Sequence, residues 1–126
     1  NEYGYAGTTS QTGIAGHGSA SPFDIQAVLI AAGPDFREGL VLDTPTANVD
    51  LAPTLLYLLA LGMPNSMEGR VITEALREGP TPSSLQAETR HHSFELELAS
   101  GSYVASAQVS ILDEYVYLDH AEVQRP

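Results

Sequence analysis

The sequence predicts an α/β fold followed by an antiparallel β meander, and three patterns of apolar residues support this prediction. Residues 25–32 form a short apolar run with β-branched side chains, which is typical of a strand buried on both faces. Residues 48–61 have the apolar spacing of a helix. Residues 91–123 alternate between apolar and polar side chains, as strands with one solvated face do.

The composition bounds the class of protein. The chain has 126 residues, of which 43% are hydrophobic, enough for one domain with a core. Its formal net charge is −11, from 16 Asp and Glu against 5 Lys and Arg. Nucleic acids and anionic membranes require a basic face, so we expect neither as a partner. Lysine and cysteine are absent, which excludes a Walker loop, a Schiff-base enzyme, disulfides and thiolate sites.

The first third of the chain is predicted to be an irregular segment followed by strands. Residues 1–22 are rich in Gly, Ser and Thr, which favours an irregular segment. The strand at 25–32 is expected to stop at Gly33 and Pro34, and a second short strand is expected at 40–42. The chain shows neither an initiator Met nor a signal peptide, so we expect it to be a piece of a longer product.

The middle of the chain predicts two helices. In the first, over 48–61, Asp50 is expected to be the N-cap, which places Pro53 in the first turn, where its missing N–H costs little. Gly62 and Pro64 are expected to end this helix. A second helix is predicted over 70–78, with its inner face formed by Val71, Ile72, Ala75 and Leu76.

The last third predicts strands joined by turns. Residues 81–84 form a linker, and the apolar side chains of the first strand of the meander are Phe94, Leu96 and Leu98. Turns are expected at 99–102 and 113–114. We therefore divide the chain into residues 1–79 and a second part, 80–126, of linker and antiparallel strands.

The four histidines are the side chains that could take part in chemistry near neutral pH. His17 lies between glycines, which leave its imidazole uncrowded, so it fits either a metal ligand or catalytic base or a solvated loop residue. His91 and His92 are adjacent in a strand and point to opposite faces, so they cannot readily share a metal ion. His120 is expected at the surface. The scattered carboxylates define no paired-carboxylate site.

Several segments, taken in order, resemble the C-terminal part of the alkaline phosphatase superfamily, in its type I phosphodiesterase/nucleotide pyrophosphatase or sulfatase-like branch. The resemblance covers residues 14–78, about half of the chain. Its motifs are Gly16-His17-Gly18-Ser19, Ser21-Pro22-Phe23-Asp24, the stretch 29–39 with its Gly-Pro turn, Asn48-Val49-Asp50-Leu51-Ala52-Pro53-Thr54, and Met67-Glu68-Gly69-Arg70. The last departs from the family, where Asp is more usual than Glu before Gly-Arg.

The resemblance implies that residues 1–79 are the C-terminal segment of a catalytic domain, a three-layer α/β/α sandwich. It implies a hydrolase of phosphate mono- or diesters or of sulfate esters that uses two divalent metal ions, with Zn²⁺ as the expected identity. His17 would be one metal ligand. The nucleophile and the other ligands lie N-terminal to this segment in the family, so we expect no catalytic residue here and an inactive chain when it stands alone. The missing N-terminal part of the same protein is then its expected partner.

Two alternatives to the hydrolase stay open. The resemblance also fits a mutase or transferase of the same superfamily, because the motifs present do not separate these chemistries. The chain could instead be a non-catalytic acidic α+β interaction module built on the 91–123 meander. In either case the apolar strand and helix leave surface to cover, so we expect a homo-oligomer or a complex with the rest of the protein. The sequence does not set the compartment; the resemblance favours an exported protein, periplasmic or secreted.

Overall fold

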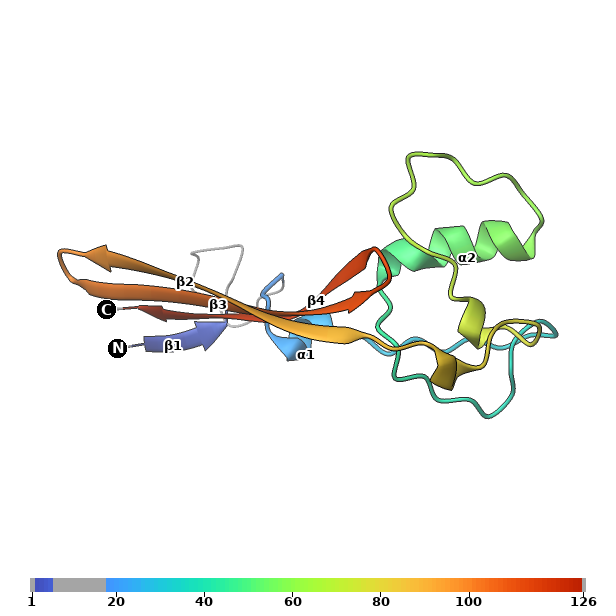
Figure 1. The fold of residues 1–126 in the computed structure, drawn as a ribbon, viewed down its shortest axis with the longest axis horizontal. Helices are drawn as coiled ribbons and strands as arrows, with labels where there is room; N and C mark the ends of the chain where they lie inside the picture. Colours follow the sequence, from blue (N-terminus) through green and yellow to red (C-terminus); the bar gives the residue numbers. More distant parts are fainter. Residues whose placement is uncertain (1, 6–17, 126) are drawn as a thin grey trace. The chain divides into compact units, whose positions relative to one another are not determined.

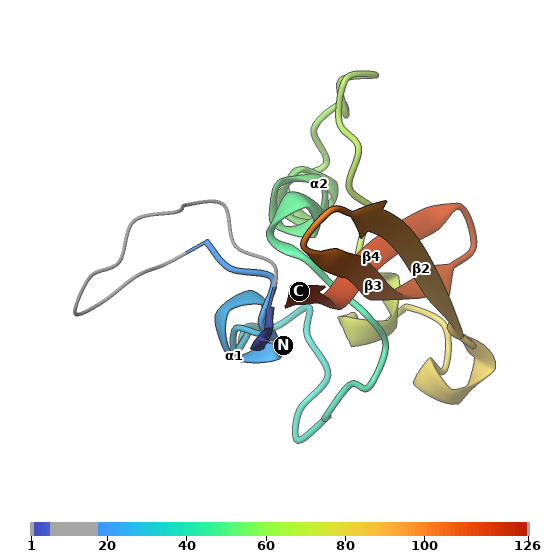
Figure 2. The ribbon, with the colours of Figure 1, turned by 90° about the vertical axis from the view of Figure 1, so that its left-hand side faces the viewer.

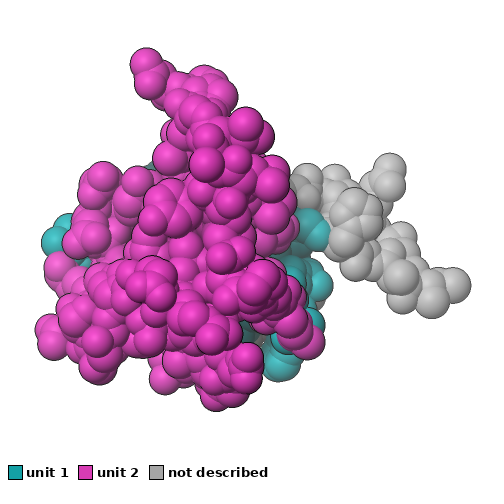
Figure 3. Space-filling view, turned by 90° about the vertical axis from the view of Figure 1, so that its right-hand side faces the viewer, with its two compact units in different colours: residues 1–28, 89–110, 118–126 teal, residues 29–88, 111–117 magenta. Residues whose placement is uncertain are grey.

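The structure, a computed structural model, describes residues 2–5 and 18–125 and shows a small mixed α+β fold (Figures 1 and 2). The chain forms two compact units (Figure 3). We call residues 1–28, 89–110 and 118–126 the sheet unit, and residues 29–88 and 111–117 the helix unit. The end of one β-hairpin, 111–117, thus belongs to the helix unit.

The sheet confirms the predicted meander. Strands β2 (Glu88–Leu98), β3 (Gly101–Leu112) and β4 (Tyr115–Arg125) follow one another and lie side by side in the order β1-β4-β3-β2. Two-residue turns at 99–100 and 113–114 join them, as the sequence predicts. Asp113 has φ 54°, the left-handed conformation that tight hairpin turns require.

A fourth strand lies where an irregular segment is predicted. β1 (Glu2–Tyr5) pairs antiparallel with β4, with Glu2 opposite Arg125 and Tyr5 opposite Glu122. This part of the 1–22 prediction is wrong because the pairing joins the two ends of the chain. Local composition carries no signal for such a long-range contact.

The strand predicted over 25–32 is not formed. A short helix α1 (Pro22–Ile25) occupies its start, and residues 26–32 have no regular structure. Val28 is 86% and Ile30 84% exposed. A strand buried on both faces needs neighbouring strands and covering layers, and the described residues pair no strand with this segment. The short strand predicted at 40–42 is absent for the same reason.

The main helix forms as predicted but ends early. A 3₁₀ turn, η1 (Asn48–Asp50), leads into α2 (Leu51–Leu58), and Pro53 lies in its first turn. The helix ends before Gly62 in a Schellman motif: Ala60 has φ 53°, and the N–H of Leu61 donates to the Leu56 carbonyl at 2.9 Å. Ala60 thus takes the left-handed position that glycine usually fills.

The second predicted helix, 70–78, is wrong. Only one 3₁₀ turn, η2 (Thr73–Ala75), forms there. The backbone of this segment bonds across the unit to residues 35–37: the Arg37 N–H donates to the Ala75 carbonyl at 3.0 Å, and the Arg77 N–H donates to the Asp35 carbonyl at 2.8 Å. These long-range bonds use groups that a helix would pair locally. Another 3₁₀ turn, η3 (Pro82–Ser84), lies in the predicted linker.

The apolar core is small. In the helix unit the buried hydrophobic side chains come from the 72–76 segment and the hairpin end, namely Ile72, Leu76, Leu112 and Tyr117. In the sheet, the expected covered face of β2 is open: Phe94 is 61% exposed, and Leu96 and Leu98 are nearly half exposed. The alternation along β2 therefore predicts the strand correctly, but the burial expected for its apolar side chains is wrong.

Candidate functional site

The predicted metal ligand, His17, lies outside the described residues. The chain that follows it turns tightly. Gly18 has φ 79°, where a side chain would be strained. The hydroxyl of Ser19 donates to the Asp24 carboxylate, and the buried Ser21 caps α1 by accepting the N–H of Phe23 at 3.2 Å. Position 18 thus has the backbone conformation that favours glycine, and Ser19 has a structural partner.

The other histidines do not gather with acidic residues. His91 and His92 are exposed on β2, and His120 is half-buried in β4. Within residues 2–5 and 18–125, no group of three or more metal-binding side chains lies together. A metal ion held by protein ligands alone commonly needs three or four of them. The described part of the chain therefore does not fit a complete metal site.

The motif residues instead build a buried polar cluster in the helix unit, which we call the Asp50 cluster: Thr44, Asp50, Thr54, Arg70, Glu74 and Tyr117. Asp50 is completely buried. Its Oδ2 accepts the N–H of Ala47 at 2.9 Å, and its Oδ1 accepts the N–H of Arg70 at 2.8 Å. Asp50 is the N-cap residue of α2, as predicted, but its side chain makes no cap bond to this helix. The carboxylate instead bonds to Ala47, in the loop before η1, and to Arg70, in the Met67-Glu68-Gly69-Arg70 motif.

Arg70 and Glu74 form a buried two-pronged ion pair. Arg70 Nη1 lies 2.8 Å from Glu74 Oε2, and Nη2 lies 2.6 Å from Oε1. Thr44 donates its hydroxyl to Glu74 at 2.7 Å. Burial acts to raise the Glu74 pKa, but the hydrogen bonds from Arg70 and Thr44 outweigh it and lower the pKa below its ordinary value of 4.5. Glu74 is therefore a buried carboxylate that stays charged.

The remaining donors of Arg70 bond to its neighbour Val71 and to two distant segments, at Pro45 and Tyr117. Its Nη2 donates to the Pro45 carbonyl at 3.0 Å, its Nη1 to the Val71 carbonyl at 3.3 Å, and its Nε to the Tyr117 hydroxyl at 3.0 Å. Burial and the charge of Asp50 raise the pKa of Tyr117 to about 12, although Arg70 opposes the shift. All five N–H groups of the guanidinium now have partners. Arg70 therefore has no donor left for a phosphate or sulfate group.

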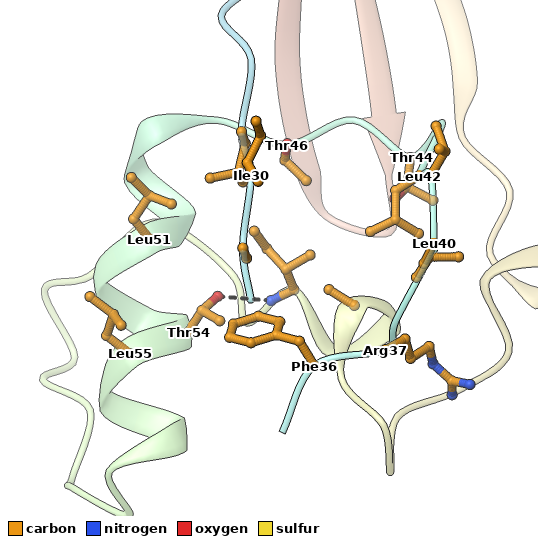
Figure 4. Close-up of a pocket in the computed structure, with 15 residues that line it drawn as sticks. Ile30, Phe36, Arg37, Leu40, Leu42, Thr44, Thr46, Leu51, Thr54 and Leu55 are labelled. Carbon is orange, nitrogen blue, oxygen red and sulfur yellow. Dashed lines mark hydrogen bonds between the residues drawn. The ribbon is translucent and has the colours of Figure 1, made fainter. Parts of the chain in front are cut away.

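An apolar cavity of about 530 Å³ lies beside this cluster, within the helix unit (Figure 4). Thr54 links the two: its hydroxyl donates to the Asp50 carbonyl at 2.7 Å and accepts the N–H of Ile72 at 3.0 Å, the bond drawn dashed in Figure 4. The wall consists mainly of aliphatic side chains and Phe36, with Arg37 at one side. Such a lining suits apolar groups.

Sequence reasoning missed most of this cluster. Glu74 is not among the residues predicted for the inner face of the 70–78 helix, yet it is completely buried. One signal was available, since Arg70 and Glu74 carry opposite charges four residues apart. Tyr117 gave no signal, because its contact with Arg70 spans 47 residues.

No family model, curated protein or solved structure matches this chain. Among the helices of the described residues, none has the length and apolar character needed to cross a membrane.

Proposed function

We propose that this chain is the C-terminal segment of a metal-dependent hydrolase of the alkaline phosphatase superfamily that cleaves phosphate mono- or diesters or sulfate esters. One observation carries the proposal: two of the motifs that resemble the family meet in the fold. These are the motif at 48–54 and the motif at 67–70. Asp50 of the former accepts the N–H of Arg70 of the latter, and Gly69 lies against the backbone of Val49. A chance similarity gives two motifs no reason to pack on each other.

The exposed apolar surface of the helix unit supports the inference that another layer of the protein covers it. Ile30 is 84% and Val41 85% exposed, and Leu55 of α2 is more than half exposed. Surfaces of this kind mark places where another part of a protein packs. We infer that this layer is the N-terminal part of the same protein, and that segment 29–32 and α2 belong to the three-layer α/β/α sandwich of the family.

His17 is the one residue of this chain to which the proposal gives a place in the metal site. An imidazole nitrogen of His17 would bind one of two divalent ions, which we expect to be Zn²⁺. Such ions would polarise the ester and activate the attacking group. The remaining ligands and the nucleophile are assigned to the N-terminal part. The chain alone is therefore expected to be inactive.

The test uses the protein made from a gene extended upstream of Asn1. We expect it to hydrolyse bis(p-nitrophenyl) phosphate, p-nitrophenyl phosphate or p-nitrophenyl sulfate, and to lose activity with a chelator. His17→Ala should lower kcat/KM about a hundredfold or more and reduce bound metal. His120→Ala, in β4, is the matched control and should keep both. Unchanged turnover and metal content in His17→Ala would rule out the assigned role of His17.

The non-catalytic interaction module remains the second candidate, and the exposed strand β2 favours it. It predicts a gene that begins near Asn1, with no upstream segment carrying a nucleophile and Asp-His motifs. The extended gene therefore distinguishes the two candidates before any assay is made.

A further inference from the structure

Strand β2 is a long, open edge of the sheet. In the order β1-β4-β3-β2 it lies last, next to β3 alone among the described strands, and all 11 of its residues are exposed. Every second N–H and C=O along an edge strand points away from its neighbour. Proteins usually protect such an edge with short strands, bulges, proline or charged side chains, because an open edge is a template for pairing with another strand. β2 is long and carries charged side chains of both signs. β2 has no proline.

Imidazoles and carboxylates are unevenly placed along β2. The first half carries Glu88, Arg90, His91 and His92, and the second half carries Glu95 and Glu97. Two copies of β2 can pair antiparallel about a twofold axis perpendicular to the sheet. Such pairing brings the first half of each strand against the second half of the other. A parallel arrangement in register would instead place glutamate beside glutamate.

The strand has a register that suits self-pairing. When the axis passes through Ser93, His91 of each copy lies opposite Glu95 of the other; when it passes through Phe94, His91 lies opposite Glu97. An imidazole N–H can donate to a carboxylate in either charge state. Directly opposed residues share one face of the sheet, so both registers form two reciprocal His–Glu pairs.

The same pairing gives the exposed apolar side chains of β2 cross-strand neighbours. Phe94, Leu96 and Leu98 lie on one face of β2, at 61%, 46% and 45% exposure. In the Ser93 register Phe94 lies opposite His92, and in the Phe94 register it lies opposite its own copy. Aromatic cross-strand pairs are among those that stabilise sheets.

We propose that two copies of this chain associate through β2 as antiparallel strands, so that one sheet runs across both copies. The occupant of the β2 edge is thus a second copy, selected because His91 of each strand lies opposite a glutamate of the other. This inference does not depend on the proposed hydrolase function.

The first test measures the dimer dissociation constant by analytical ultracentrifugation of the full chain. His91→Glu places glutamates opposite glutamates in either register and should raise this constant at least about tenfold. The triple variant His91→Glu/Glu95→His/Glu97→His reverses the order of charge and should restore dimerisation. His120→Glu makes the same charge change in β4, which is flanked by β1 and β3, and should leave the constant within about twofold of the wild type.

The second test locates the contact by hydrogen exchange. Amides at alternate positions of residues 89–97 should become protected as the protein concentration rises, and this protection should be absent in His91→Glu. A monomer at all concentrations would overturn the proposal. A dimer that His91→Glu leaves intact, or protection confined to the helix unit, would overturn it as well, because association would then use another surface.

Discussion

The carboxylate of Asp50 accepts the backbone N–H of Arg70 at 2.8 Å, although the two residues are 20 positions apart. The same carboxylate accepts the N–H of Ala47, so a single completely buried side chain ties together the start of η1 and the segment before η2. Arg70 extends the connection to Glu74 and to Tyr117 in β4. The helix unit is therefore organised around charged groups as much as around its small apolar core.

Replacing Asp50 with Ala should lower the free energy of unfolding by about 2–5 kcal/mol. The substitution leaves the N–H groups of Ala47 and Arg70 without a partner, and each unpaired buried group costs about 1–3 kcal/mol. Urea denaturation followed by circular dichroism measures the change. Asp43→Ala, at an exposed position, is the matched control and should change stability by less than about 0.5 kcal/mol. Equal stability of the two variants would show that the Asp50 bonds do not hold the unit.

Glu74→Gln should weaken the fold at neutral pH and flatten its response to acid. Arg70 and Thr44 hold the Glu74 pKa below 4.5 in the folded chain, so its stabilisation is present above the unfolded value and is lost as pH falls through the folded one. Breaking such a buried pair costs about 3–5 kcal/mol. The wild type should therefore lose stability below pH 4.5, and the variant should lose less over the same range.

The measurement is a series of urea denaturations between pH 7 and pH 3. Glu78→Gln is the control, because Glu78 is exposed and has the same charge. It should follow the wild-type pH profile. An unaltered pH profile in Glu74→Gln would contradict the assignment of acid sensitivity to this carboxylate.

Gly69→Ala should prevent the two motifs from packing. A Cβ at this position would overlap the carbonyl of Val49, which is backbone and cannot move aside without shifting η1. We expect a loss of at least about 1–3 kcal/mol, the usual cost of overpacking. Gly62→Ala is the matched control, because nothing lies within 4 Å of the added carbon. Thermal unfolding of both variants is the measurement. A loss of stability in Gly69→Ala alone shows that the contact with Val49 requires glycine, and an equal loss in both variants contradicts this.

Ala60→Gly should stabilise the chain by about 1 kcal/mol. Ala60 holds φ 53° at the end of α2, a conformation that costs a residue with a Cβ roughly 1–2 kcal/mol and costs glycine little. Part of the gain is offset because glycine is more flexible in the unfolded chain. Ala52→Gly, within α2, should instead destabilise by up to about 1 kcal/mol. Opposite signs in chemical denaturation confirm the Schellman end; equal signs contradict it.

The elements predicted best from the sequence are those that local pattern determines. The alternation over 91–123 and its turns yield β2, β3 and β4, and the leucine spacing with Pro53 yields α2. The prediction failed where the backbone bonds over long distances: β1 pairs with the far end of β4, and the 70–78 segment bonds to residues 35–37 in place of forming a helix.

The candidate site shows the same division. Reading the residues singled out Asp50, Gly69 and Arg70 as parts of motifs, and the structure brings these motifs into contact. Their roles could not be read in advance. Asp50 lies at the predicted N-cap position, but its carboxylate bonds across the unit to Arg70. Glu74, which is not among the residues predicted for the inner face of the 70–78 helix, is buried and accepts hydrogen bonds from Arg70 and Thr44.

The sequence by itself determined that this chain is acidic, that a helix begins near residue 50, and that a three-strand meander forms its last third. These properties follow from composition and from periodicity over a few neighbouring residues. Only the tertiary structure decided that Arg70 is shared by Glu74, Pro45 and Tyr117, and that β2 lies at the edge of the sheet among the described strands. Such features depend on which distant segments meet, and a contact across tens of residues leaves no local pattern.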